Sequence, residues 1–85
     1  MFIVAKHTIH DPEKFWQAVQ DSMPRIPDSA KPHAVLPNKD GNEAVCLWES
    51  DSIDTVKNYI ESEAGDVSTN EFYEVESSKA LGLPG

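Results

Sequence analysis

The sequence predicts an α+β fold in which four short strands and two helices follow one another in the order βαββαβ. Two segments repeat apolar residues at helical spacing and begin with helix-capping residues. Four other segments are short, rich in apolar and β-branched residues, and bounded mainly by Pro, Gly, Asn or Asp. A chain of 85 residues is the length of one domain, so residues 1–85 are expected to fold as a single unit.

The first part of the chain is expected to contain a strand, a helix and a loop. Residues 1–9 (MFIVAKHTI) are largely apolar or β-branched, which favours a strand. Asp11 can cap a helix and Pro12 suits its first position, so a helix is predicted to run from there to about Ser22. Residues 23–32 contain three prolines, which lack the backbone N–H, and are therefore expected to form an ordered loop.

A hairpin is predicted next, with a short strand at residues 33–36 (HAVL) and a second strand at residues 43–50 (EAVCLWES). Asp40 and Gly41 lie between them and tolerate the positive φ angles that tight turns require. The second strand is apolar at nearly every position, which indicates that it is central in the sheet.

The remaining elements are a helix within residues 50–65 and a last strand at residues 71–75 (EFYEV). Three residues can cap the start of this helix: Ser50, Asp51 and Ser52. Gly65 is predicted to end it in the left-handed conformation. The leucines of the tail that follows, Leu81 and Leu83, are expected to dock on another part of the structure.

This order predicts a ferredoxin-like arrangement: a four-stranded antiparallel sheet, with both helices on one face and the first and third strands at its centre. Both central strands, residues 1–9 and 43–50, carry apolar side chains on both sides. The face without helices is therefore expected to be an apolar surface that includes Trp48, and monomers rarely leave such a surface open. A homodimer that pairs sheet against sheet would cover it.

The order of elements, the chain length and the segment AVCLWESDSIDTVKNYIE resemble the dimeric α+β-barrel superfamily. Its small members include proteins similar to antibiotic-biosynthesis monooxygenases and to muconolactone isomerases. The segments VAKHTI and VCLWESDSIDTV most resemble an uncharacterised branch that has relatives described as nickel-binding. The resemblance implies a homodimer that binds a small, partly apolar molecule in a cavity between the two sheets. His7, Cys46 and Trp48 would line this cavity, with His33 as a further candidate.

Two alternative functions follow from the same resemblance. The first is an enzyme, a cofactor-free monooxygenase or isomerase acting on a small aromatic, for which His7 is the candidate acid or base. Trp48 could stack on a flat substrate. The sequence contains no GxSxG, GxGxxG or GK[ST] motif, and no cofactor is predicted.

The second alternative is nickel or zinc binding. His7 and His10 are three residues apart, and on a strand this spacing sends two side chains to opposite faces. His10 is therefore interpreted as a solvated turn residue. His33 is expected about 10 Å from His7, two strands away, so Glu49 or Glu74 would have to supply further ligands. No metal site is predicted, and His7 and His33 are the candidates should a metal bind.

The chain has a net charge of −8, all of which arises after residue 42. This excess of acidic residues disfavours binding to nucleic acids and to anionic membrane surfaces. No apolar run approaches the roughly 20 residues of a membrane span, and a cytoplasmic location is expected. Cys46 is the only cysteine, which excludes an internal disulfide, and its apolar surroundings favour a buried core residue.

Overall fold

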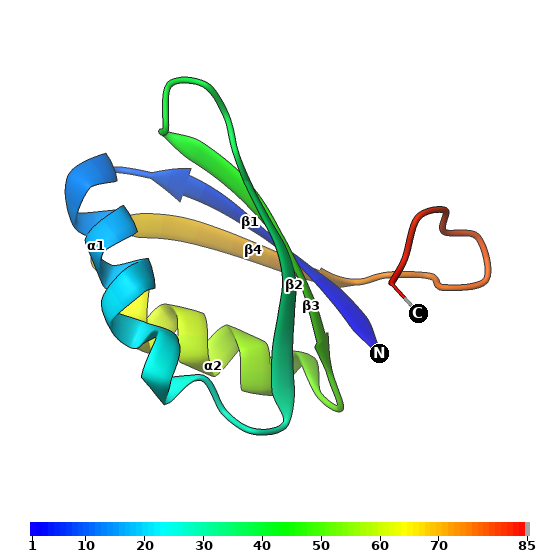
Figure 1. Cartoon of the computed structure of the whole chain (residues 1–85). Helices are drawn as coiled ribbons and strands as arrows, with labels where there is room; N and C mark the ends of the chain where they lie inside the picture. Colours follow the sequence, from blue (N-terminus) through cyan, green and yellow to red (C-terminus); the bar gives the residue numbers. More distant parts are fainter. Residues whose placement is uncertain (85) are drawn as a thin grey trace.

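The computed structural model describes residues 1–84 and has the predicted order of strands and helices (Figure 1). The elements are β1 (Phe2–Ile9), α1 (Pro12–Ser22), the 3-10 helix η1 (Met23–Arg25), β2 (Ala30–Pro37), β3 (Glu43–Ser50), α2 (Ile53–Ala64) and β4 (Ser68–Glu74). The strands form one antiparallel sheet in the order β2-β3-β1-β4, so β1 and β3 are central as predicted. Both helices lie on one face of the sheet, and the ferredoxin-like fold is confirmed.

The main differences from the predicted boundaries concern the two edge strands. β2 begins at Ala30 and contains Pro32 within what was expected to be a loop. An edge strand pairs on one side only, so it tolerates a residue without a backbone N–H, and the pairing with β3 shifts between Pro32 and Ala34. β4 begins at Ser68 because polar residues before the predicted start continue its pairing with β1.

Capping residues fix both helix starts. The Asp11 side chain accepts a hydrogen bond from the Lys14 N–H at 3.1 Å, as predicted for α1. Ser52 is the residue that caps α2, accepting from the Asp54 N–H at 3.1 Å.

The two glycines expected to adopt a positive φ behave differently. Gly41 has φ 76° in the β2–β3 turn, as predicted. The prediction for Gly65 was wrong, because its φ of −62° is right-handed. A Cβ at Gly65 would collide with the Glu61 carbonyl oxygen, so the last turn of α2 has no room for a side chain at this position.

The core lies between the sheet and the helices. The larger of two clusters joins β1, β3 and α2, and its buried members include Ile3, Cys46, Trp48 and Val56. The smaller cluster lies at the other end of the sheet and centres on Phe15 of α1. Every second residue of each central strand is buried beneath the helices, as the strand period requires.

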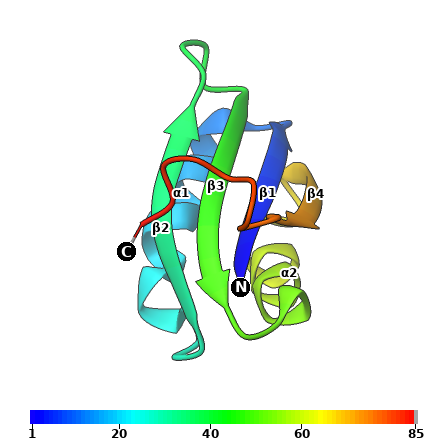
Figure 2. The same ribbon diagram turned by 90° about the vertical axis from the view of Figure 1, so that its right-hand side faces the viewer.

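The opposite face of the sheet carries no helix (Figure 1). We call it the open face; its apolar residues are Phe2, Val4, Ala34, Leu36, Val45, Leu47 and Tyr73. The expectation that Trp48 lies on this face was wrong, since Trp48 is buried on the helix side. The tail after β4 runs on the open side, in front of β1 and β3 in Figure 2. Leu81 in this tail is 98% exposed and so does not dock within the chain, contrary to expectation, whereas Leu83 is partly buried.

No helix formed by residues 1–84 is both long enough and apolar enough to cross a membrane.

Candidate functional site

A pocket of about 140 Å³ lies between the helices and the sheet. We call it the helix–sheet pocket. The strands contribute side chains such as His7, Cys46 and Trp48, and the helices contribute mainly apolar ones, among them Phe15, Ala18, Val19 and Ile60. The pocket forms because α1 packs on the sheet mainly through Phe15, while its small residue Ala18 leaves space below the helix.

His7, Cys46 and Trp48 were expected to line a cavity on the open face between two sheets. The structure corrects this placement, because all three side chains point beneath the helices. The strand period places His7 with Ile3 and Ala5, and these aliphatic residues are the ones that pack against α2. The three residues do come together as predicted, but in a pocket within one chain.

His7 is held by two hydrogen bonds from neighbouring strands. Its Nδ1 lies 2.6 Å from Oδ1 of Asn70 on β4, directly opposite in the strand register. Asn70 Nδ2 donates to Oε1 of Glu61 at 3.1 Å, which orients the amide so that its oxygen faces the imidazole. His7 therefore carries its proton on Nδ1, and Nε2 is an acceptor.

The free Nε2 atom of His7 faces the sulfur of Cys46 at 3.2 Å. Burial is the main influence on both groups. It lowers the pKa of His7 below 6.5, more strongly than Asn70 and Glu61 raise it. Burial also raises the pKa of Cys46 to about 11. Both groups are therefore neutral at pH 7, and the Cys46 thiol donates its hydrogen bond to His7.

Asn70 and Glu61 are members of this site that the sequence did not indicate. An asparagine and a glutamate on separate elements form no recognisable spacing with His7. Only the pairing register of β1 with β4, which sets Asn70 opposite His7, shows that they belong together.

Acidification is expected to destabilise the protein partly through His7. Between the lowered pKa of His7 and 6.5, the unfolded chain binds a proton that the folded chain does not, so stability falls as pH decreases. Urea unfolding at pH 7 and pH 5 should show a smaller loss of stability for His7→Gln than for the wild type. Equal losses in the two proteins would contradict the buried, neutral state of His7.

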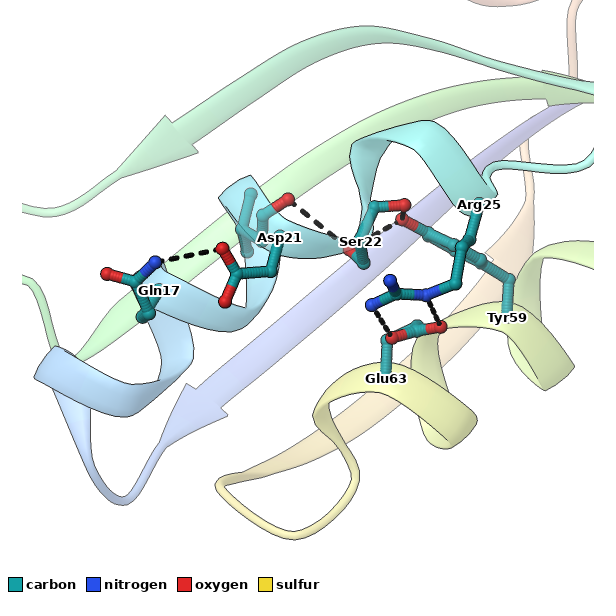
Figure 3. Close-up of polar contacts among 7 residues, drawn as sticks. Gln17, Asp21, Ser22, Arg25, Tyr59 and Glu63 are labelled. Carbon is teal, nitrogen blue, oxygen red and sulfur yellow. Dashed lines mark hydrogen bonds and ion pairs between the residues drawn. The ribbon is translucent and has the colours of Figure 1, made fainter.

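Two polar contacts join α1 and η1 to α2 beside the pocket (Figure 3). The Tyr59 hydroxyl donates to Ser22, with 2.7 Å between the two hydroxyl oxygens. Arg25 forms a bidentate ion pair with Glu63, with both N···O distances at 2.9 Å. Ser22, Tyr59 and Glu63 also line the pocket, so these contacts fix the separation of the helices at its edge.

His33 lies on the other side of the sheet from His7. Its Nε2 is 2.8 Å from Oε1 of Glu49, and its ring packs against Phe2 with 5.7 Å between ring centroids. His7 and His33 therefore cannot bind the same metal ion within one chain. Residues 1–84 contain no group of three or more His, Cys, Asp or Glu side chains placed to bind a metal. His10 is exposed and contacts Thr69, in agreement with a solvated turn residue.

Trp48 has a buried indole nitrogen without a hydrogen-bond partner. Its Nε1 is the only such buried side-chain atom in the part of the chain that the structure describes. The indole packs edge-on against Tyr59, with 5.7 Å between ring centroids. A buried N–H without an acceptor costs about 1–3 kcal/mol, and residues 1–84 supply no acceptor for this one.

No model of a known protein family matches this chain, and a search of curated proteins finds no significantly similar relative.

Proposed function

We propose that this protein binds a small, largely apolar molecule in the helix–sheet pocket. The proposal rests on one observation: the pocket is a cavity of about 140 Å³ whose walls are formed mainly by apolar side chains. This volume is close to that of an engineered apolar protein cavity of roughly 150 Å³ that binds benzene. The occupant is therefore a molecule of about one ring, with at most one or two polar atoms.

Filling the pocket is expected to abolish binding. Ala18 lines the pocket from α1, so the phenyl ring of Ala18→Phe would occupy the space that a ligand needs. Titration with benzene, followed by NMR chemical shifts of pocket residues, should show saturable binding to the wild type and none to Ala18→Phe. Gln20→Phe is the matched control, since Gln20 is exposed on the same helix and should leave binding unchanged. Absence of benzene binding to the wild type would contradict the proposal.

The open face supports a second proposal, that two copies of this chain pair sheet against sheet. Phe2, Val4, Val45 and Leu47 form an apolar centre on this face. The rim carries both charges, because Lys6 and Lys31 lie near acidic residues that include Glu43, Glu49 and Glu71. A face with both signs of charge can be complementary to its own copy, as a two-fold interface requires.

The exposed tail fits the same arrangement. Leu81 is 98% exposed, and the tail that contains it runs on the open side of the sheet, where a second copy would lie (Figure 2). A chain of this length buries a modest core, and pairing through the open face would add buried apolar area.

His7 makes acid–base catalysis a second candidate function. Its neutral imidazole has a protonated Nδ1 and an unprotonated Nε2, which accepts a hydrogen bond from the Cys46 thiol. Its ring lies in the wall of the pocket, with 5.4 Å between its centroid and that of Phe15. An imidazole in this state can remove a proton from a bound molecule, as isomerisation of a small aromatic without a cofactor would require. Under this proposal, His7→Gln would bind benzene normally but lose turnover.

A further inference from the structure

We propose that Cys46 is a nucleophile, activated by His7 as general base, that adds to small apolar α,β-unsaturated carbonyl compounds in the helix–sheet pocket. Asn70 is the positioning residue for His7. This inference rests on the proposed binding function, because the electrophile must enter the same pocket. It assigns a chemical role to Cys46 in place of the core role that its apolar surroundings favoured.

The geometry matches what an activated thiol requires. A nucleophile needs a base within hydrogen-bond reach and a third group that orients the base. Cys46 Sγ lies 3.2 Å from His7 Nε2, and Asn70 Oδ1 holds His7 Nδ1 at 2.6 Å. The same constellation of Cys, His and Asn activates the thiol in unrelated proteases.

The tautomer of His7 favours proton transfer from the thiol. Glu61 accepts from Asn70 Nδ2, so the amide oxygen of Asn70 faces His7 and accepts the Nδ1 proton. The lone pair of Nε2 is thereby directed at the thiol. A flipped Asn70 amide would leave Glu61 without its donor, so the second contact holds the first in place.

The position of Cys46 in the sheet selects the kind of electrophile. Cys46 lies in the middle of β3 and pairs with Ala5 on one side and Val35 on the other. The strand ladders on both sides use the neighbouring backbone N–H groups, and none is free to form an oxyanion hole next to the sulfur. Attack of the thiol on an ester or amide carbonyl would place negative charge on an oxygen next to the sulfur, where no backbone N–H is available to donate a hydrogen bond.

Conjugate addition places the charge further from the sulfur. In an enone, the charge develops on the carbonyl oxygen at the far end of the conjugated system. Trp48 follows Cys46 by two residues on the same face of β3, which places their Cα atoms about 7 Å apart along the strand. Trp48 also lines the pocket, and its Nε1–H, which has no acceptor within residues 1–84, would be the donor to this oxygen.

The proposed step is balanced without an oxidant or a second substrate. His7 Nε2 takes the proton from Cys46 Sγ as the sulfur forms a bond to the β-carbon. The electron pair of the C=C bond moves to the enolate, whose oxygen accepts a hydrogen bond from Trp48. The imidazolium of His7 then returns the proton to the α-carbon, so the net reaction adds S–H across the double bond.

Cyclohexenone and cyclohexanone form a matched pair of probes, of nearly equal size, of which only the first is an electrophile. Mass spectrometry of intact protein at pH 7 should show one cyclohexenone adduct on the wild type and none on Cys46→Ser. His7→Gln should react about 100-fold more slowly, the usual contribution of a general base. Asn70→Leu should also react more slowly, and Asn70→Asp, which keeps an acceptor oxygen but repels Glu61, should recover part of the rate.

The pH profile of the wild type separates a general base from simple ionisation and needs no variant. The titratable groups near His7 come from β3 and α2. Cys46 on β3 contacts His7, and Glu61 on α2 belongs to its hydrogen-bond network. Tyr59 and Glu63 on α2 line the same pocket. With His7 as base, the adduct rate should be flat from pH 7 to pH 9. Reaction through free thiolate alone would instead rise about tenfold per pH unit in this range.

Cyclohexanone binding, measured by NMR, distinguishes failure of the two proposals. If cyclohexanone binds in the pocket but cyclohexenone forms no adduct, or His7→Gln reacts as fast as the wild type, the nucleophile assignment is overturned and the binding function stands. If neither ketone binds, the binding function fails, and this inference fails with it.

Discussion

Replacing Ile3 with alanine is expected to lower the free energy of unfolding by about 2–5 kcal/mol. Ile3 is fully buried near the start of β1 and belongs to the core cluster that joins the sheet to α2. The substitution removes apolar contacts and leaves a cavity that the surrounding sheet cannot close. Urea unfolding at a fixed protein concentration, followed by circular dichroism, measures the change.

Two further variants calibrate this result. Ile3→Val removes a single methylene and should cost only about 0.5–1.5 kcal/mol. Leu81→Ala removes an equally large side chain, but Leu81 is 98% exposed, so the unfolding energy of the separate chain should change by less than about 0.5 kcal/mol. A loss below about 1 kcal/mol for Ile3→Ala would contradict the burial of the Ile3 side chain between the sheet and α2.

Replacing Leu47 with lysine is expected to convert a homodimer into monomers at micromolar concentration. Leu47 lies at the centre of the open face, paired with Val4 on β1 and Ala34 on β2. A two-fold interface contains both copies of each of its residues, so two lysines would be buried in it. Burying charges without partners costs several kcal/mol each, more than an interface of this kind can offset.

Sedimentation velocity measures this change directly. Gln20→Lys introduces the same charge on the exposed side of α1, away from the open face, and should sediment like the wild type. A wild type that sediments as a monomer at micromolar concentration would overturn the dimer proposal. A Leu47→Lys variant that dimerises as strongly as the wild type would place the interface elsewhere on the surface.

Local sequence signals predicted the elements with strong boundary chemistry. Asp11 and Pro12 fixed the start of α1, and the apolar run EAVCLWES predicted the bounds of β3. The bounds of the edge strands β2 and β4 were predicted less well. An edge strand is paired on one side only and is partly exposed, so its residues resemble those of a loop. Pro32 is an example, since a proline is compatible with a strand only when one side of that strand is unpaired.

His7, Cys46 and Trp48 were predicted to lie together, but the position of the pocket was not predicted. The contributions of Asn70 and Glu61 were not predicted either, and His33 lies on the other face of the sheet. The strand period separates His7 from His10, and it places Cys46 and Trp48 together on one side of β3. It does not say which of the two sides faces the helices. In β1, the side that faces the helices carries Ile3 and Ala5, which pack against α2. The side on the open face carries Lys6 and Thr8.

The sequence by itself determined the order of elements, the central position of β1 and β3, and the presence of His7 and the only cysteine, Cys46, on these two neighbouring strands. These follow from local spacing, capping and turn chemistry, which act over a few residues. The tertiary structure decided that His7, Cys46 and Trp48 lie beneath the helices, and that Asn70 and Glu61 complete the site. Those contacts join residues up to 63 positions apart, and only the packing of helices on the sheet and the register of the strands determine them.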